Sequence, residues 1–260
     1  MNIIVRHIWD RFKKIRHNIP IRSFKKIHIN SWNNFRHNLF SCKLFILSII
    51  KRPEQVIYIG DSHSYSFSLP FEPTDDNINK LIKINNTEYL CWLGPRLLYS
   101  VIDKGINPDL VSILNYFRSC KEQIILVWFL GEIDIRVFGK EKYLKTNENM
   151  DHLIKNYVEY LSSNFSNFRN IIAIPAKPSD IGFNNPSYPK NGSLDERIIV
   201  FKLFEKAVKN QKAIPYFDQN KFVIGDYLSK NETNDGTHFD FNYSLKIRNI
   251  LIKQIFNTQD

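Results

Sequence analysis

The chain of 260 residues has few cysteines and no long apolar run. Its three cysteines, Cys42, Cys91 and Cys120, form no closely spaced pair, and an odd number argues against a disulfide framework. The first apolar run, Leu44–Ile50, is far shorter than a membrane-spanning helix and lacks the features of a secretory signal. These absences favour reduced, buried thiols and a cytoplasmic location.

The sequence also lacks the short motifs of several other chemistries. It contains no glycine-rich phosphate-binding loop, no His-Glu-x-x-His motif and no paired-cysteine metal motif. Its aromatic residues are scattered at the spacing of a core, and they form no base-stacking pattern. We therefore expect a protein without a metal or cofactor and without a nucleic-acid partner.

Positive charge is concentrated near the N-terminus. Residues 1–52 contain twelve Lys and Arg but one acid, Asp10, whereas the whole chain carries a net charge of +10. The remainder is thus close to neutral and attracts a polyanion only weakly. We expect residues 1–52 to be a basic, helical extension of a main domain at residues 53–260.

Three interpretations of this extension stay open. Ile4, Ile8 and Phe12 fall at helical spacing, which fits a solvated helix packed on the domain. The same apolar face, flanked by basic residues, fits peripheral contact with anionic lipid at the inner membrane face, or with a protein partner. Nucleic-acid contact is the third.

After Pro53, short apolar runs alternate with longer helix-like stretches, which is the pattern of βαβ units. We expect strands near Val56–Ile59, Tyr89–Trp92, Ile124–Leu130, Asn170–Ile174 and Ala213–Phe217. We expect helices over Pro108–Cys120, Asn149–Asn164, Leu194–Asn210 and Tyr243–Phe256. The predicted fold is α/β, a three-layer αβα sandwich with a doubly wound, mainly parallel five-stranded sheet. Ligands bind such sheets beyond the carboxyl ends of the strands.

A serine lies at the first of these strand ends, in Gly60-Asp61-Ser62-His63. Gly60 permits a tight turn, and a helix that begins at Ser62 directs free backbone N–H groups toward a developing oxyanion. The same four residues also occur in ordinary turns and helix caps, so the motif by itself decides little.

Near the other end of the chain, Asp235-Gly236-Thr237-His238 supplies a base and a carboxylate. A serine becomes a nucleophile when an imidazole takes its proton, and a carboxylate fixes the tautomer of that imidazole. A spacing of three lets Asp235 reach His238. Taken alone, the segment also fits an exposed turn before the last helix.

Together, these blocks resemble the SGNH or GDSL hydrolase family over residues 54–256. The matching positions are Gly60-Asp61-Ser62, Gly94 after the second strand, Gly131-Glu132-Ile133-Asp134 after the third, and Asp235-x-x-His238. The resemblance implies that Ser62 attacks an acyl carbonyl, that His238 is the base and that Asp235 orients it. It also implies that the Ser62 and Gly94 N–H groups stabilise the oxyanion.

The third block departs from the family pattern, Gly-x-Asn-Asp, because Ile133 replaces an asparagine that donates to the oxyanion. Loss of one such donor can lower the rate by about 10²–10³. Glu132, Asp134 and Arg136 alternate along what we expect to be an extended segment, so they should project to one side, with Ile133 and Ile135 on the other. Arg136 either donates to an oxyanion or substrate anion, or belongs to a structural network with the carboxylates.

The Gly-Glu-Ile-Asp-x-Arg and Gly-Asp-Ser-His blocks are similar to a bacterial subgroup associated with surface-polysaccharide and capsule clusters. This similarity implies a carbohydrate acyl-ester substrate, such as an O-acetyl group that is removed, or installed from an acyl donor. The alternative is an inactive carbohydrate-binding or assembly protein. His63 is a candidate substrate contact, or else an exposed histidine; the loop at Ala176–Gly192 either faces substrate or is surface disorder.

Overall fold

The structure is a computed structural model of the chain. The described residues are 54–65, 75–116, 124–182, 186–233 and 235–257. The predicted extension at residues 1–52 lies outside them, as do Cys42 and Cys120. Cys91 is described, and it is the buried thiol that the sequence predicts.

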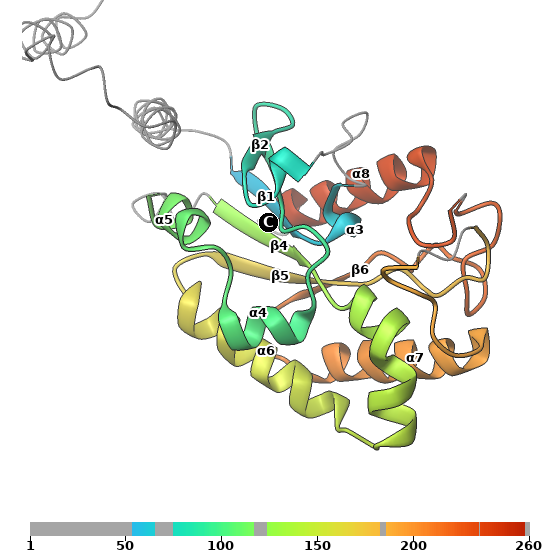
Figure 1. The fold of residues 1–260 in the computed structure, drawn as a ribbon. Helices are drawn as coiled ribbons and strands as arrows, with labels where there is room; N and C mark the ends of the chain where they lie inside the picture. The colour runs from blue at the N-terminus through green and yellow to red at the C-terminus, as the bar shows by residue number, and fades with distance from the viewer. Residues whose placement is uncertain (1–53, 66–74, 117–123, 183–185, 234, 258–260) are drawn as a thin grey trace, which may run out of the picture. The chain divides into compact units, whose positions relative to one another are not determined.

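Six strands form one sheet in the order β2-β3-β1-β4-β5-β6 (Figure 1). Their bounds are Gln55–Gly60 (β1), Leu81–Lys83 (β2), Glu88–Trp92 (β3), Ile124–Phe129 (β4), Arg169–Ile174 (β5) and Tyr216–Asp218 (β6). All five predicted strands are present and parallel, which confirms the α/β fold class. The predicted strand number is one too low, because β2 adds an antiparallel edge. It is short and only partly buried, so it has too few apolar positions to reveal a period.

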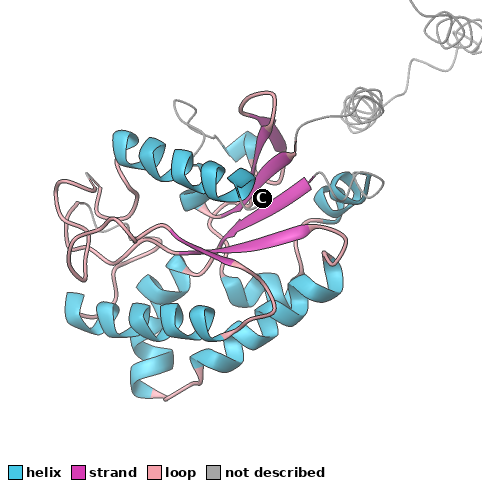
Figure 2. Cartoon of the chain, turned by 180° about the vertical axis from the view of Figure 1, so that it is seen from behind, coloured by secondary structure: helices cyan, strands magenta, loops and turns pink. Residues whose placement is uncertain are grey.

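Helices cover both faces of the sheet. Figure 1 shows α4 (Leu98–Lys104), α6 (Met150–Asn164) and α7 (Leu194–Asn210) on one side and α8 (Phe241–Asn257) on the other. Figure 2 shows the same layers from behind. Every residue of β1 and β4 is buried, which explains why both read as nearly continuous apolar runs.

The bounds of the long helices follow from their caps. Ser193 and Glu196 form a capping box that starts α7, and the Asn149 side chain accepts the Asp151 amide at the start of α6. Both helices begin within one residue of the predicted position. A shorter helix, α5 (Pro108–Tyr116), ends where the described residues stop.

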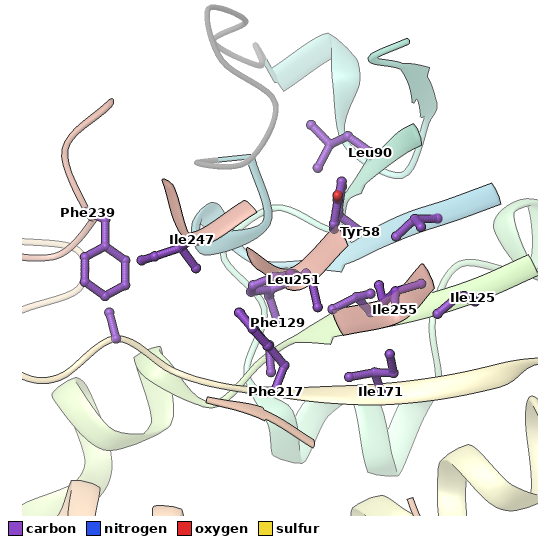
Figure 3. Packing of buried hydrophobic residues seen from close by; sticks show 14 of the residues in the cluster. Tyr58, Leu90, Ile125, Phe129, Ile171, Phe217, Phe239, Ile247, Leu251 and Ile255 are labelled. Atoms are coloured by element: carbon purple, nitrogen blue, oxygen red, sulfur yellow. The ribbon is translucent and has the colours of Figure 1, made fainter. Parts of the chain in front are cut away.

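The core between the sheet and α8 is apolar, with an ion pair at its edge. Figure 3 shows Ile247, Leu251 and Ile255 of α8 packed over side chains of the central strands. At the edge, Arg248 donates to the Glu88 carboxylate at 2.8 Å, which fixes α8 to β3.

No helix in the described part of the chain is long and apolar enough to cross a membrane.

The chain direction across the sheet reverses beside β1. From β1 the chain continues to β2 and β3 on one side, then crosses back to β4 on the other. Such a reversal leaves a crevice at the carboxyl ends of the two strands that flank it. The segments that follow β1 and β4 therefore meet at the position where this class of fold binds ligands.

Candidate active site

The turn after β1 is fixed by a close backbone contact. A Cβ on Gly60 would lie 2.0 Å from the Phe129 carbonyl oxygen, so only glycine fits between β1 and β4. The Asp61 N–H donates to the same Phe129 oxygen at 3.0 Å. Ser62 then begins the short helix α3 (Ser62–Tyr65), as predicted, and its side chain is partly exposed at the sheet edge.

The turn before α8 brings a histidine and a carboxylate to this serine. His238 Nε2 lies 2.7 Å from Ser62 Oγ, and His238 Nδ1 lies 2.6 Å from Asp235 Oδ2. The other carboxylate oxygen, Asp235 Oδ1, accepts the backbone amides of Thr237 and His238, both at 2.8 Å. One carboxylate thus shapes the turn and holds the imidazole, although Asp235 itself lies at the surface.

The charge on Asp235 is stabilised by these contacts. Burial alone would raise its pKa, but the hydrogen bond from His238, the charge of His238 and the amide hydrogen bonds outweigh burial and hold the pKa well below its usual range. Asp235 is therefore ionised throughout the neutral range. An ionised carboxylate on Nδ1 leaves Nε2 as the nitrogen that accepts a proton from Ser62.

Gly94 lies beside the serine turn, as its place after β3 predicts. The preceding residue, Leu93, donates its N–H to the Gly60 carbonyl oxygen at 2.7 Å. Within the described part of the chain, neither the Ser62 N–H nor the Gly94 N–H has an acceptor. Ile133, at the position of the missing asparagine, is 2% exposed and carries no donor.

The segment after β4 is helical, so the prediction of an extended segment there is wrong. Residues 134–138 form a turn of π-helix, and Glu132 and Arg136 lie one turn apart. Asp134 points elsewhere: its Oδ2 accepts the Leu98 amide at 2.8 Å and caps α4. An alternation of charges at positions i, i+2 and i+4 fits both structures, which is why the sequence misleads here.

Arg136 belongs to a carboxylate network, one of its two predicted roles. Its Nε and Nη2 donate to the two Glu132 oxygens at 2.6 and 3.1 Å, and its Nη1 donates to the Tyr188 carbonyl oxygen. Burial would raise the Glu132 pKa, but the neighbouring His63 and the Arg136 charge lower it to about 2. The pair is therefore ionised on both sides.

His63 is buried, which contradicts the interpretation as an exposed histidine. It is 3% exposed, and its ring centroid lies 4.9 Å from that of His238. Its Nε2 lies 3.7 Å from Glu132 Oε2, which is too long for a hydrogen bond, and that nitrogen has no hydrogen-bond partner among the described residues. Burial lowers the His63 pKa, so the ring is neutral near pH 7.

The loop between β5 and α7 packs directly on the Asp235 turn. Gly236 has φ +73°, and a Cβ there would meet the Ile181 carbonyl oxygen at 1.6 Å. The Lys190 ammonium donates to that same oxygen. The start of the loop, the Glu132–Arg136 pair, and Gly236 and Thr237 of the Asp235 turn together line a small, partly open pocket.

Sequence reasoning missed two residues that support the Asp235 turn. Thr233 Oγ1 accepts the Gly236 amide at 2.9 Å. Threonine hydroxyls often accept a backbone amide in turns, so a threonine two residues before Asp235 could have indicated this contact. Lys190 is distant in sequence, and no local pattern marks it.

Among the described residues no group of three His, Cys, Asp or Glu side chains is arranged to hold a metal ion.

Comparison with known proteins identifies the fold. No protein-family model matches the sequence, and no curated protein matches it. Among solved structures, a GDSL-like lipase from Bacteroides thetaiotaomicron has a TM-score of 0.52 and 15% identity, over 84% of this chain and 97% of that one.

Two further structures have lower scores. A carbohydrate acetylesterase from Sinorhizobium meliloti has a TM-score of 0.47 and 12% identity, over 79% of this chain and 99% of that one. An aryl esterase from M. smegmatis has a TM-score of 0.45 and 14% identity, over 78% and 99%. Of these three structures, the lipase has a score that indicates a shared topology. The chain has the fold of the SGNH/GDSL hydrolases, the family that its sequence blocks resemble.

Proposed function

We propose that this protein is a serine-dependent ester hydrolase in which Ser62 is the nucleophile, His238 the general base and Asp235 the residue that orients it. One observation carries the proposal, namely the hydrogen-bonded series Ser62 Oγ, His238 Nε2, His238 Nδ1 and Asp235 Oδ2, with distances of 2.7 and 2.6 Å. These are the contacts that an activated serine needs.

The reaction follows from this geometry. His238 Nε2 takes the proton of Ser62 as Oγ bonds to the acyl carbon, and the carbonyl oxygen becomes an oxyanion. The intermediate collapses, the alcohol leaves with the proton from His238, and the acyl group stays on Ser62. His238 then deprotonates a water that attacks the acyl-enzyme, and the carboxylic acid is released with Ser62 regenerated.

Two backbone donors serve the oxyanion in this proposal, the N–H groups of Ser62 and Gly94. Ile133 removes the third donor of the family pattern, and a missing donor costs about 10²–10³ in rate. A hydrolase of this kind is therefore expected to be slow on simple esters. Arg136 is not a substitute, because its guanidinium already donates to Glu132 and Tyr188.

The substrate proposed is an acyl ester of a carbohydrate, such as an O-acetyl group of a bacterial surface polysaccharide or its precursor. The support is the resemblance of the Gly-Asp-Ser-His and Gly-Glu-Ile-Asp-x-Arg blocks to the polysaccharide-associated subgroup. A small pocket lined by Thr237 and Arg136 lies beside the turn that carries His238. Transfer to a sugar hydroxyl would use the same acyl-enzyme with a different acceptor.

The test is turnover and labelling of the purified full chain. We expect slow hydrolysis of p-nitrophenyl acetate and covalent labelling by a fluorophosphonate probe, both abolished in Ser62→Ala. Ser112→Ala is the matched control, because Ser112 is exposed on α5 and its hydroxyl donates only to the Pro108 carbonyl. Equal labelling of Ser62→Ala and the wild type would refute the assignment. Release of acetate from an acetylated oligosaccharide would indicate hydrolysis, and acetylation of a free oligosaccharide from p-nitrophenyl acetate would indicate transfer.

A second candidate, a carbohydrate-binding or assembly protein without turnover, is favoured by one observation. Ile133 is buried and supplies no hydrogen bond where the family pattern has a donor. Glycan binding that is unchanged in Ser62→Ala and His238→Ala, with no probe labelling of the wild type, would establish this function and exclude the hydrolase.

We also propose that residues 1–52 bring the domain to an anionic membrane surface. The support is their charge, twelve Lys and Arg against one acid. Flotation with phosphatidylserine vesicles, compared between the full chain and a chain without residues 1–52, tests this. Equal flotation of the two would exclude it.

A further inference from the structure

His63 forms a wall against one face of the His238 ring. The two ring centroids are 4.9 Å apart and the ring planes make an angle of 43°. His63 immediately follows Ser62 on α3, so one short helix carries both the serine at Nε2 and the side chain against the ring face. At 3% exposure, His63 has almost no surface to offer a substrate, which removes its predicted role as a substrate contact.

Two groups fix the position of His63. Its backbone N–H donates to Asp61 Oδ1 at 2.9 Å, and its ring faces the Glu132 carboxylate at 3.7 Å. Glu132 is itself held by the two hydrogen bonds from Arg136. The wall is therefore supported from the segments after both β1 and β4.

The orientation of the His238 ring plane matters for catalysis. The hydrogen bonds at Nδ1 and Nε2 hold the two ring nitrogens, and a neighbouring ring packed against the imidazole opposes tilting of its plane. A tilt would move the lone pair of Nε2 off the Ser62 hydroxyl, and proton transfer is sensitive to such displacement.

We propose that His63 is a positioning residue, whose buried ring holds His238 in the single orientation that bridges Ser62 and Asp235. The inference rests on the proposed function and adds a residue to it. His63 acts through His238 and does not touch the reacting atoms. What the position requires is a flat, uncharged ring, since a positive charge on the wall would oppose formation of the His238 imidazolium.

The surrounding charges are compatible with this role. Around the two rings lie the carboxylates of Asp61, Glu132 and Asp235 and the guanidinium of Arg136. Arg136 is bound to Glu132, so it offsets that charge locally. The His63 Nε2 atom has no hydrogen-bond partner among the described residues, and replacing the imidazole with an apolar ring therefore removes no hydrogen bond there.

Two substitutions separate a ring wall from an imidazole function. In His63→Phe the wall stays, and we expect kcat for p-nitrophenyl acetate within about threefold of wild type, because the geometry of transfer is kept. In His63→Ala the wall is lost, and we expect kcat to fall by about 10–10² with KM nearly unchanged. His152→Ala, an exposed histidine on α6, is the matched control and is expected to match wild type.

A second measurement reads the position of His238 without turnover. We expect the His238 imidazole signals in two-dimensional NMR, assigned with His238→Gln, to stay sharp and nearly unshifted in His63→Phe and to shift or broaden in His63→Ala. A wild-type kcat and unchanged His238 signals in His63→Ala would overturn the proposal. So would equal losses in His63→Phe and His63→Ala when both variants unfold at the wild-type temperature. If wild type itself shows no Ser62-dependent turnover, the proposed function fails, and the NMR comparison still decides the role of His63.

Discussion

The Glu132 carboxylate accepts two hydrogen bonds from Arg136 one helical turn later, in a place where both side chains are almost fully buried. Each charge has lost most of its hydration and depends on the other for compensation. The Glu132 pKa shows the balance: burial raises it, but the neighbouring His63 ring and the charge of Arg136 lower it to about 2. The pair is thus a fixed ionic element beside His63 and the Asp235 turn.

Removal of one partner should be costly. We expect Arg136→Gln to lower the free energy of unfolding by about 3–5 kcal/mol, because a buried carboxylate is left uncompensated. The double variant Glu132→Gln/Arg136→Gln should recover part of that loss. Urea denaturation of the full chain measures both.

The matched control for Arg136→Gln is Lys145→Gln in the exposed Glu141–Lys145 pair, which has the same i,i+4 spacing. An exposed pair of this kind contributes about 0.5 kcal/mol or less. If Arg136→Gln costs no more than Lys145→Gln, the buried pair has no special role in stability.

The sequence predicts the fold well where burial is complete. β1 and β4 are buried along their whole length, so the sequence shows them as apolar runs. The start of α7 is predictable because its first residues form a capping box. The edge strand β2 has no such pattern and was missed. A strand that is buried on both faces can be predicted from its apolar run, whereas a short, partly buried strand cannot.

The site is predictable in part, for similar reasons. Ser62, Asp235 and His238 stand in short motifs at strand and helix ends, and the structure brings them together. The packing of Gly236 on Ile181 and the tilted ring contact of His63 with His238 involve residues far apart in sequence with ordinary local context. Such contacts depend on how the loops fold over the sheet, which local pattern does not encode.

Gly60 should tolerate no larger side chain. A Cβ there would overlap the Phe129 carbonyl oxygen, so Gly60→Ala must separate β1 from β4 at the serine turn. We expect a loss of about 1–3 kcal/mol in stability and a larger loss of activity, because Ser62 moves away from His238. Thermal unfolding and ester hydrolysis measure these.

Gly225→Ala is the control for this variant, since Gly225 also has a positive φ but no atom within 4 Å of its Cβ position. It should lose some stability through backbone strain and keep the wild-type kcat. Full activity in Gly60→Ala would contradict the importance of the close contact.

Asp235→Asn should separate the two tasks of this carboxylate. The amide side chain would keep an oxygen that accepts the Thr237 and His238 amides, so the turn should survive, but it cannot stabilise a positive imidazole. We expect kcat/KM to fall by about 10²–10⁴ with little change in unfolding temperature. Asp240→Asn, which changes an acceptor of the Tyr243 amide outside the site, should stay fully active. Equal activity of the two variants would argue against the role of Asp235.

The Asp134 carboxyl should make the protein less stable as the pH rises. It is 1% exposed, its Oδ1 has no hydrogen-bond partner among the described residues, and burial raises its pKa from 3.8 to about 6. Between about pH 4 and pH 6 the folded chain therefore binds a proton that the unfolded chain has released, so this group lowers stability across that window as the pH increases. Asp134→Asn keeps an acceptor for the Leu98 amide and does not titrate.

The difference in unfolding free energy, variant minus wild type, should thus increase by about 2 kcal/mol between pH 4 and pH 7. Urea denaturation at several pH values measures it. Other buried acids, such as Asp61, are common to both proteins and cancel in the difference. Parallel curves would mean that Asp134 has the same pKa in the folded and unfolded chain. In that case burial of the Asp134 carboxyl at the start of α4 would not lower the free energy of unfolding.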